Sequence, residues 1–77
     1  MDNLYRLEVN GHTYLSDRAY IDNAIKIGRE AMKGKHAIIA VEKERVVMLL
    51  SEPHKTAKEL DKAKQEYINM GFTVYTA

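Results

Sequence analysis

The stretch at residues 36–51, HAIIAVEKERVVMLLS, constrains the fold of this chain more than any other segment. Two apolar runs flank the charged letters EKER, which is the pattern of a β-hairpin closed by a polar turn. Neither run alternates apolar with polar residues, so both faces of each strand are apolar and both need cover. We expect pairing that begins with Val41 opposite Val46 and continues with Ala40 opposite Val47.

The two faces of this hairpin have different expected surroundings. Helices packed on one side of the sheet would cover the face that holds Ile39, Val41 and Met48. The other face carries four apolar side chains, with one spare tyrosine nearby: Ile38, Ala40, Val47, Leu49 and Tyr75. Left open, this face would approach the roughly 300–600 Å² of the largest apolar patch on a monomer. We interpret it as a partner-binding surface, covered most economically by a second copy in a two-fold dimer. The alternative is one helix on each face, which would bury both faces within the chain.

A second hairpin is predicted near the start of the sequence. Two strand-like runs flank Asn10-Gly11, which is the strongest short signal for a tight turn because a type I′ turn needs positive φ at both central residues. Centring the turn there pairs Leu7 with Tyr14. One face of this hairpin is then apolar and the other largely polar, as in a half-buried antiparallel pair.

Two helices follow the two hairpins. Residues 17–33 keep helical spacing after Ser16, which we expect as the N-cap, and Gly28 inside this helix indicates either a close approach to the sheet or simple tolerance. The second helix is expected to open at residues 51–53, because serine caps helices and proline is accepted in the first turn. The last strand is expected at residues 72–76. The apolar stripe of the first helix holds Tyr20, Ile21, Ala24, Ile25, Gly28, Ala31 and Met32.

The predicted order is therefore ββαββαβ in a single domain, residues 1–77. The fold class is α+β: a two-layer sandwich in which two helices pack on one face of a mixed sheet. Without its first strand the order is βαββαβ, so an arrangement related to the ferredoxin-like order is one option. The hairpin at Asn10-Gly11 then requires that the last strand moves to another edge or that the fold is a different one.

The composition argues against most chemistry. There is no cysteine, and the three histidines, His12, His36 and His54, have no metal-ligand spacing. Nucleophile elbows, glycine-rich phosphate loops and paired carboxylates are missing from the sequence. We therefore expect no metal, no cofactor and no enzymatic activity.

Charge and hydropathy restrict the location. The net charge is +1, and no apolar run approaches the roughly 20 residues that a membrane span needs. The first residues also lack the basic and apolar regions of a secretory signal. We expect a cytoplasmic protein that does not insert into membranes.

A basic row on the first helix supports an alternative function. Lys26, Arg29 and Lys33 fall at helical spacing, with Lys35 just beyond, and such a row could neutralise nucleic-acid phosphates. Acidic residues are interspersed on the same helix, so a solvated face with local charge pairs is the favoured interpretation. The predicted function is therefore a small non-catalytic protein-interaction module (a homodimer, adaptor or inhibitor), with nucleic-acid binding as the alternative.

Overall fold

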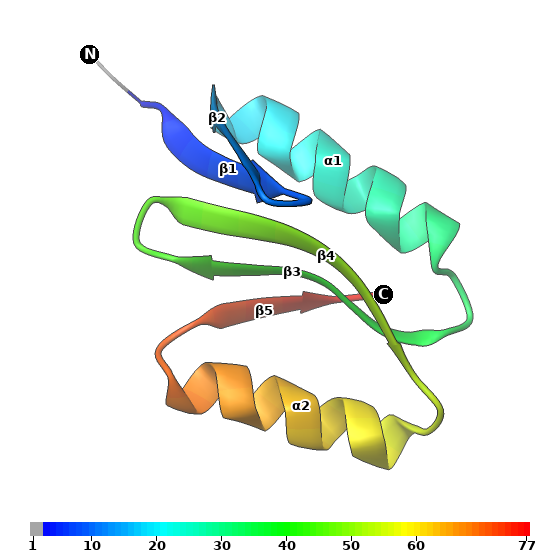
Figure 1. Cartoon of the computed structure of the whole chain (residues 1–77). Helices are drawn as coiled ribbons and strands as arrows, with labels where there is room; N and C mark the ends of the chain where they lie inside the picture. Colours follow the sequence, from blue (N-terminus) through cyan, green and yellow to red (C-terminus); the bar gives the residue numbers. More distant parts are fainter. Residues whose placement is uncertain (1–2) are drawn as a thin grey trace.

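The computed structural model describes residues 3–77 and confirms the α+β class, the mixed sheet and the predicted order of elements (Figure 1). The elements are β1 (Tyr5–Val9), β2 (His12–Ser16), α1 (Arg18–Ala31), β3 (His36–Lys43), β4 (Val46–His54), α2 (Ala57–Asn69) and β5 (Thr73–Thr76).

The five strands form one sheet in the order β2-β1-β4-β3-β5. Only β1 and β4 are parallel neighbours; the other pairs are antiparallel. The last strand lies at the edge opposite the first hairpin, which is one of the two rearrangements that this hairpin required. The pairing of β1 with β4 ends at Val9 and Leu49, so residues 50–54 of β4 have no strand on that side.

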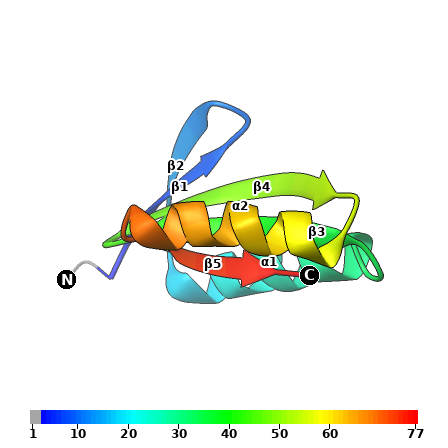
Figure 2. The same cartoon turned by 90° about the horizontal axis from the view of Figure 1, so that it is seen from below.

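The two helices lie on opposite faces of the sheet (Figures 1 and 2), which corrects the expectation that both pack on one face. α1 joins the parallel strands β2 and β3, and α2 joins the parallel strands β4 and β5. Both crossovers move in the same direction across the sheet, but their strands point in opposite directions. Because such crossovers are right-handed, the helices must fall on opposite sides. The layers are helix, sheet and helix.

The first hairpin has the predicted register. Leu7 lies opposite Tyr14, and the turn is made by Asn10 and Gly11 with φ angles of 50° and 82°. Two successive positive φ angles are the geometry that Asn-Gly adopts most readily. Local sequence alone was sufficient to predict this hairpin.

The second hairpin has a different register from the expected one. Its turn consists of Glu44 and Arg45, so Lys43 lies opposite Val46, where the sequence predicted Val41. Glu44 adopts a φ of 57°, which few non-glycine residues do. The slip of two residues shortens the loop, so more of each strand is paired. The irregular pairing between Ile38 and Ala40 also changes which residues share a face, because Ile39 joins Ala40 in the cluster beneath α1.

Both helix starts also differ from the prediction. Asp17, one residue after Ser16, caps α1, and its side chain accepts a backbone N–H at 2.8 Å. α2 begins after Thr56, because β4 continues through Ser51 and Pro53. Proline is tolerated in this part of the strand since no neighbour on the β1 side requires its missing N–H.

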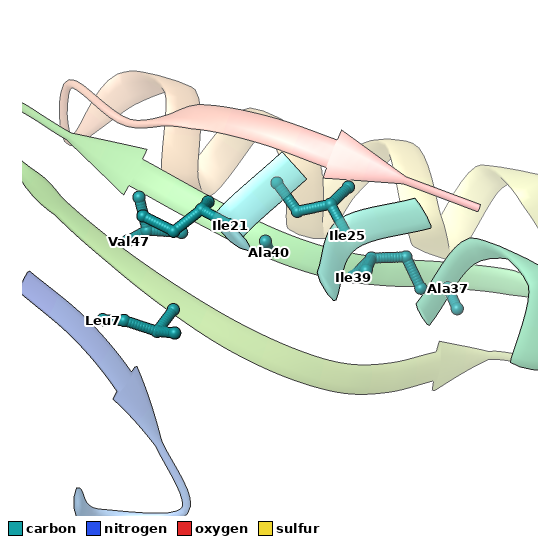
Figure 3. Packing of buried hydrophobic residues seen from close by; sticks show 7 residues of the cluster. All are labelled: Leu7, Ile21, Ile25, Ala37, Ile39, Ala40 and Val47. Carbon is teal, nitrogen blue, oxygen red and sulfur yellow. The ribbon is translucent and has the colours of Figure 1, made fainter. Parts of the chain in front are cut away.

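The main core lies between α1 and the sheet (Figure 3). Ile21 and Ile25 of α1 point toward the strands, and five consecutive residues of β3 are buried. A strand buried on both faces is typical of sheets covered on both sides. The buried cluster contains Leu7, Ile21, Ile25, Ala37, Ile39, Ala40 and Val47.

The face of the second hairpin that was expected to be open is largely covered by the chain's own helices. Ile38, Ala40 and Val47 are fully buried. Ala40 and Val47 belong to the core cluster beneath α1. Ile38 lies opposite Glu52, whose carboxylate contacts α2, so it belongs to the other face; the strand pairing is irregular between Ile38 and Ala40. The alternative of one helix on each face is the one that the structure adopts.

Gly28 marks the closest approach of α1 to the sheet. A Cβ atom there would lie 2.6 Å from Cγ2 of Ile39, which is too short for any relaxed contact. We predict that Gly28→Ala lowers the free energy of unfolding by about 1–3 kcal/mol, despite the helix propensity of alanine. Urea denaturation measures the change. In an Ile39→Ala background, which removes Cγ2, the same substitution should be neutral or stabilising; an equal loss in both backgrounds would contradict the assigned contact.

Candidate functional site

An open apolar groove lies beside α1, on the side of the first hairpin. It consists of two adjoining hollows of about 550 and 710 Å³. We call it the hairpin groove. The side chains that line it come from β1, β2, α1 and β4 and include Val9, Tyr14, Tyr20, Ala24, Ile27 and Leu49.

The hairpin groove exists because α1 carries more apolar surface than the core uses. α1 packs over β3 and β4 with Ile21 and Ile25, whereas β1 and β2 extend beyond it. Tyr20, Ala24 and Ile27 are spaced at i, i+4 and i+7, which places them along a second stripe of the helix. This stripe faces the hairpin rather than the core.

Large apolar side chains in the hairpin groove remain open to solvent. Tyr14 is 53% exposed, Tyr20 is 63% exposed and Ile27 is 60% exposed. Leu49 is half-buried and lies at the floor, where both hollows meet. It is the only residue of the predicted partner surface that borders this groove among residues 3–77.

A polar cluster fixes the N-terminal end of α1 against the sheet. Arg18 donates to Asp22 and to Oε1 of Glu42, each at 2.8 Å, and to the hydroxyl of Tyr75 at 2.9 Å. The Tyr75 hydroxyl in turn donates to the same Glu42 oxygen at 2.7 Å. The guanidinium also lies 5.4 Å from the ring centre of Tyr5. Tyr75, predicted to bind a partner, is therefore half-buried and hydrogen-bonded within the chain.

The hydrogen bonds in this cluster favour the usual charge states of Glu42, Arg18 and Tyr75. Partial burial alone would raise the pKa of Glu42, but the hydrogen bonds from Arg18 and Tyr75 outweigh it and lower the pKa. The hydrogen bond to Glu42 raises the pKa of Arg18. Partial burial and then the bond to Glu42 raise the pKa of Tyr75. Each group thus keeps its usual charge state at neutral pH, which suits a structural link rather than proton transfer.

A second polar cluster joins β4 to α2. Nε2 of His54 lies 3.1 Å from Oε1 of Glu52, and the hydroxyl of Tyr67 donates to Oε2 of the same carboxylate at 3.2 Å. Burial, followed by the nearby charge of Glu52, raises the pKa of Tyr67. A helix that opened at residues 51–53, as the sequence predicted, would have placed His54 in its first turn; His54 lies in a strand instead.

The predicted basic row is on the surface, but it is not uniform. Lys26, Arg29, Lys33 and Lys35 are all exposed. Nε of Arg29 donates to the carbonyl oxygen of Thr76 at 2.9 Å, so this guanidinium already binds the end of β5. Lys33 and Lys35 follow the end of α1 rather than continuing its face.

No function is indicated by a metal site, a membrane-spanning helix or a similarity to known proteins. Within residues 3–77, no cluster of three histidine or carboxylate side chains could hold a metal ion. In the same range, no helix is both long and apolar enough to cross a membrane. The chain matches no family model, no curated protein and no solved structure.

Sequence reasoning missed most of the hairpin groove. Tyr14 and Tyr20 were assigned to buried faces, and Ile27 was left outside the apolar stripe of its helix. The signal that was present is the width of that stripe: Tyr20 and Ile27 extend it beyond what Ile21 and Ile25 need for packing. Only the position of the hairpin outside β4 shows that this excess is left open.

The Glu42 cluster makes stability depend on acid pH. Because the pKa of Glu42 is lower in the folded state, its contribution is complete above the ordinary value of 4.5 and is lost as the pH falls through the folded-state pKa. We predict that Glu42→Gln lowers the free energy of unfolding by about 1–2 kcal/mol at pH 7. The deficit should shrink on acidification, as measured by urea denaturation at several pH values. Glu30→Gln, on the exposed surface of α1, is the control; a pH-independent deficit in Glu42→Gln would contradict the assignment.

Proposed function

We propose that this protein is a small non-catalytic interaction module that binds a partner protein through the hairpin groove. The observation that carries this proposal is the set of open aromatic and aliphatic side chains around a groove already formed in the chain: Tyr14, Tyr20 and Ile27. Contiguous exposed apolar patches on a protein surface mark interaction sites or ligand-binding grooves.

The chemistry of the hairpin groove favours a protein as the ligand. Tyrosine is enriched at protein interfaces because it combines a large apolar ring with a polar tip. Tyr14 and Tyr20 line the same hollow from a strand and a helix, so one ligand can contact both. The groove is open, as an interface is, whereas small-molecule sites usually enclose most of the ligand surface.

Nucleic-acid binding has less support. Arg29 is held by the carbonyl of Thr76, and Asp22 and Glu30 lie on the same helix as Lys26. With a net charge of +1, long-range attraction of phosphates is weak. We also propose a cytoplasmic location, because a chain without cysteine has no disulfide that a reducing compartment would break.

Site-specific photo-crosslinking in the native host tests this function. A photoreactive phenylalanine analogue replaces Tyr20 in the hairpin groove or, as a matched control, Met70, an exposed apolar residue at the end of α2. We expect protein adducts from position 20, absent from position 70 and insensitive to salt. No protein adduct at position 20, or equal adducts at both positions, would contradict the proposal. Adducts to nucleic acid from an analogue at Lys26 would favour the alternative.

A further inference from the structure

Three strand edges are unpaired among residues 3–77: the outer sides of β2 and β5, and residues 50–54 of β4. An unpaired edge presents backbone donors and acceptors to any extended segment. Proteins usually protect such edges with charge, proline or a local irregularity. The three edges differ in how far they are protected.

Two of the edges carry protection. At β5, Arg29 donates to the carbonyl oxygen of Thr76 and lies 6.0 Å from the ring centre of Tyr75, so a second copy pairing there would bring two guanidinium groups together. The open part of β4 contains Glu52 and Pro53, which add a charge and remove a donor.

β2 has no such protection. Its sequence, HTYLS, contains no lysine, arginine, aspartate, glutamate or proline, and its pairing with β1 is regular throughout. Leu15 is the most exposed large apolar residue among those described, at 73%. This edge is therefore open to pairing, and its side chains repel no neighbour.

The backbone of β2 presents specific groups outward. The backbone N–H of Arg6 donates to the carbonyl of Arg45 at 2.7 Å, away from β2. Leu15 lies opposite Arg6, so by the alternation of an antiparallel ladder its own N–H and C=O face away from β1. Thr13, two residues earlier, faces the same way.

The geometry points to a second copy of this chain as the occupant, with β2 pairing antiparallel to β2 about a two-fold axis at Tyr14. This inference rests on the proposed function and names its partner. In this register Thr13 of each copy exchanges backbone hydrogen bonds with Leu15 of the other. Tyr14 meets Tyr14 in a non-hydrogen-bonded pair, where side chains approach most closely. The outward groups of the strand are thus satisfied by the strand itself.

Charge is compatible with this pairing. The nearest charged residues in the sheet are Arg6 and Glu8 on β1. In the paired state each of these residues lies three strand spacings from the same residue of the second chain, about 14 Å at 4.8 Å per strand. That exceeds the screening length of about 8 Å at physiological ionic strength. The like charges therefore do not oppose association.

The two-fold axis is perpendicular to the sheet, so both α1 helices stay on the same face and the two hairpin grooves join. Tyr14 of one copy then lies at the open side of the groove of the other, near its Tyr20. Each of these tyrosines exposes on the order of 100 Å². Each copy contributes these two tyrosines, Leu15 and the edge of one short strand, so the paired surface belongs to the small end of specific interfaces, whose usual range begins at about 1,200 Å². The dimer is consequently weak and depends on concentration.

Sedimentation equilibrium from low micromolar to millimolar concentration tests the pairing. We expect wild type to change from monomer to dimer, and Leu15→Lys to stay monomeric with unchanged circular dichroism, because an edge lysine blocks strand addition. Thr73→Lys, which puts the same charge on the exposed edge of β5, should dimerise like wild type. In wild type, the amide hydrogens of Thr13 and Leu15 should exchange more slowly as concentration rises.

The contrary results are distinct. A wild type that stays monomeric at millimolar concentration, a Leu15→Lys variant that dimerises normally, or loss of the dimer in Thr73→Lys would overturn pairing through β2. Amide hydrogen exchange rates at Thr13 and Leu15 that do not change with protein concentration would also overturn the pairing, and this measurement needs no variant. Monomeric wild type that crosslinks to another protein from position 20 would remove the self-pairing and leave the proposed function standing.

Discussion

The structure depends on the burial of both faces of β3. Five consecutive residues of this strand are buried, so each face must be covered, and the chain has one helix for each. Right-handed crossovers place α1 and α2 on opposite sides of the sheet, which meets that requirement without any partner. Gly28 lets α1 approach Ile39 closely enough to exclude solvent. The most apolar segment of the sequence is thereby sealed by the chain itself.

Covering β3 has a consequence for the rest of the surface. α1 lies over β3 and β4, and so the hairpin formed by β1 and β2 projects beyond it (Figure 2). The polar links from Arg18 to Glu42 and Tyr75 hold α1 in that position. The side of α1 that faces the hairpin is apolar yet incompletely covered. The open groove is therefore a product of the same arrangement that completes the core.

Local signals predicted much of the fold but not its layers. The Asn10-Gly11 turn fixed one register, and helical periodicity located both helices. The register of the β3–β4 hairpin could not be predicted, because the charged residues 42–45 are compatible with more than one turn. The observed two-residue turn is the one that pairs the longer strands. The side on which each helix packs depends on strand order, which is a long-range property. For that reason Ile38 was assigned to an open surface, and Tyr20 was assigned to the core.

The burial of β3 by helices on both sides can be measured directly in dilute, monomeric protein. Solvent paramagnetic relaxation of methyl groups reports the distance of each methyl from water. The methyls of Ile39, facing α1, and of Ile38 and Val41, facing α2, should all be strongly protected, whereas those of Leu15 should relax fast. Fast relaxation of the Ile38 or Val41 methyls would show that one face of the central strand is open and would contradict the arrangement described.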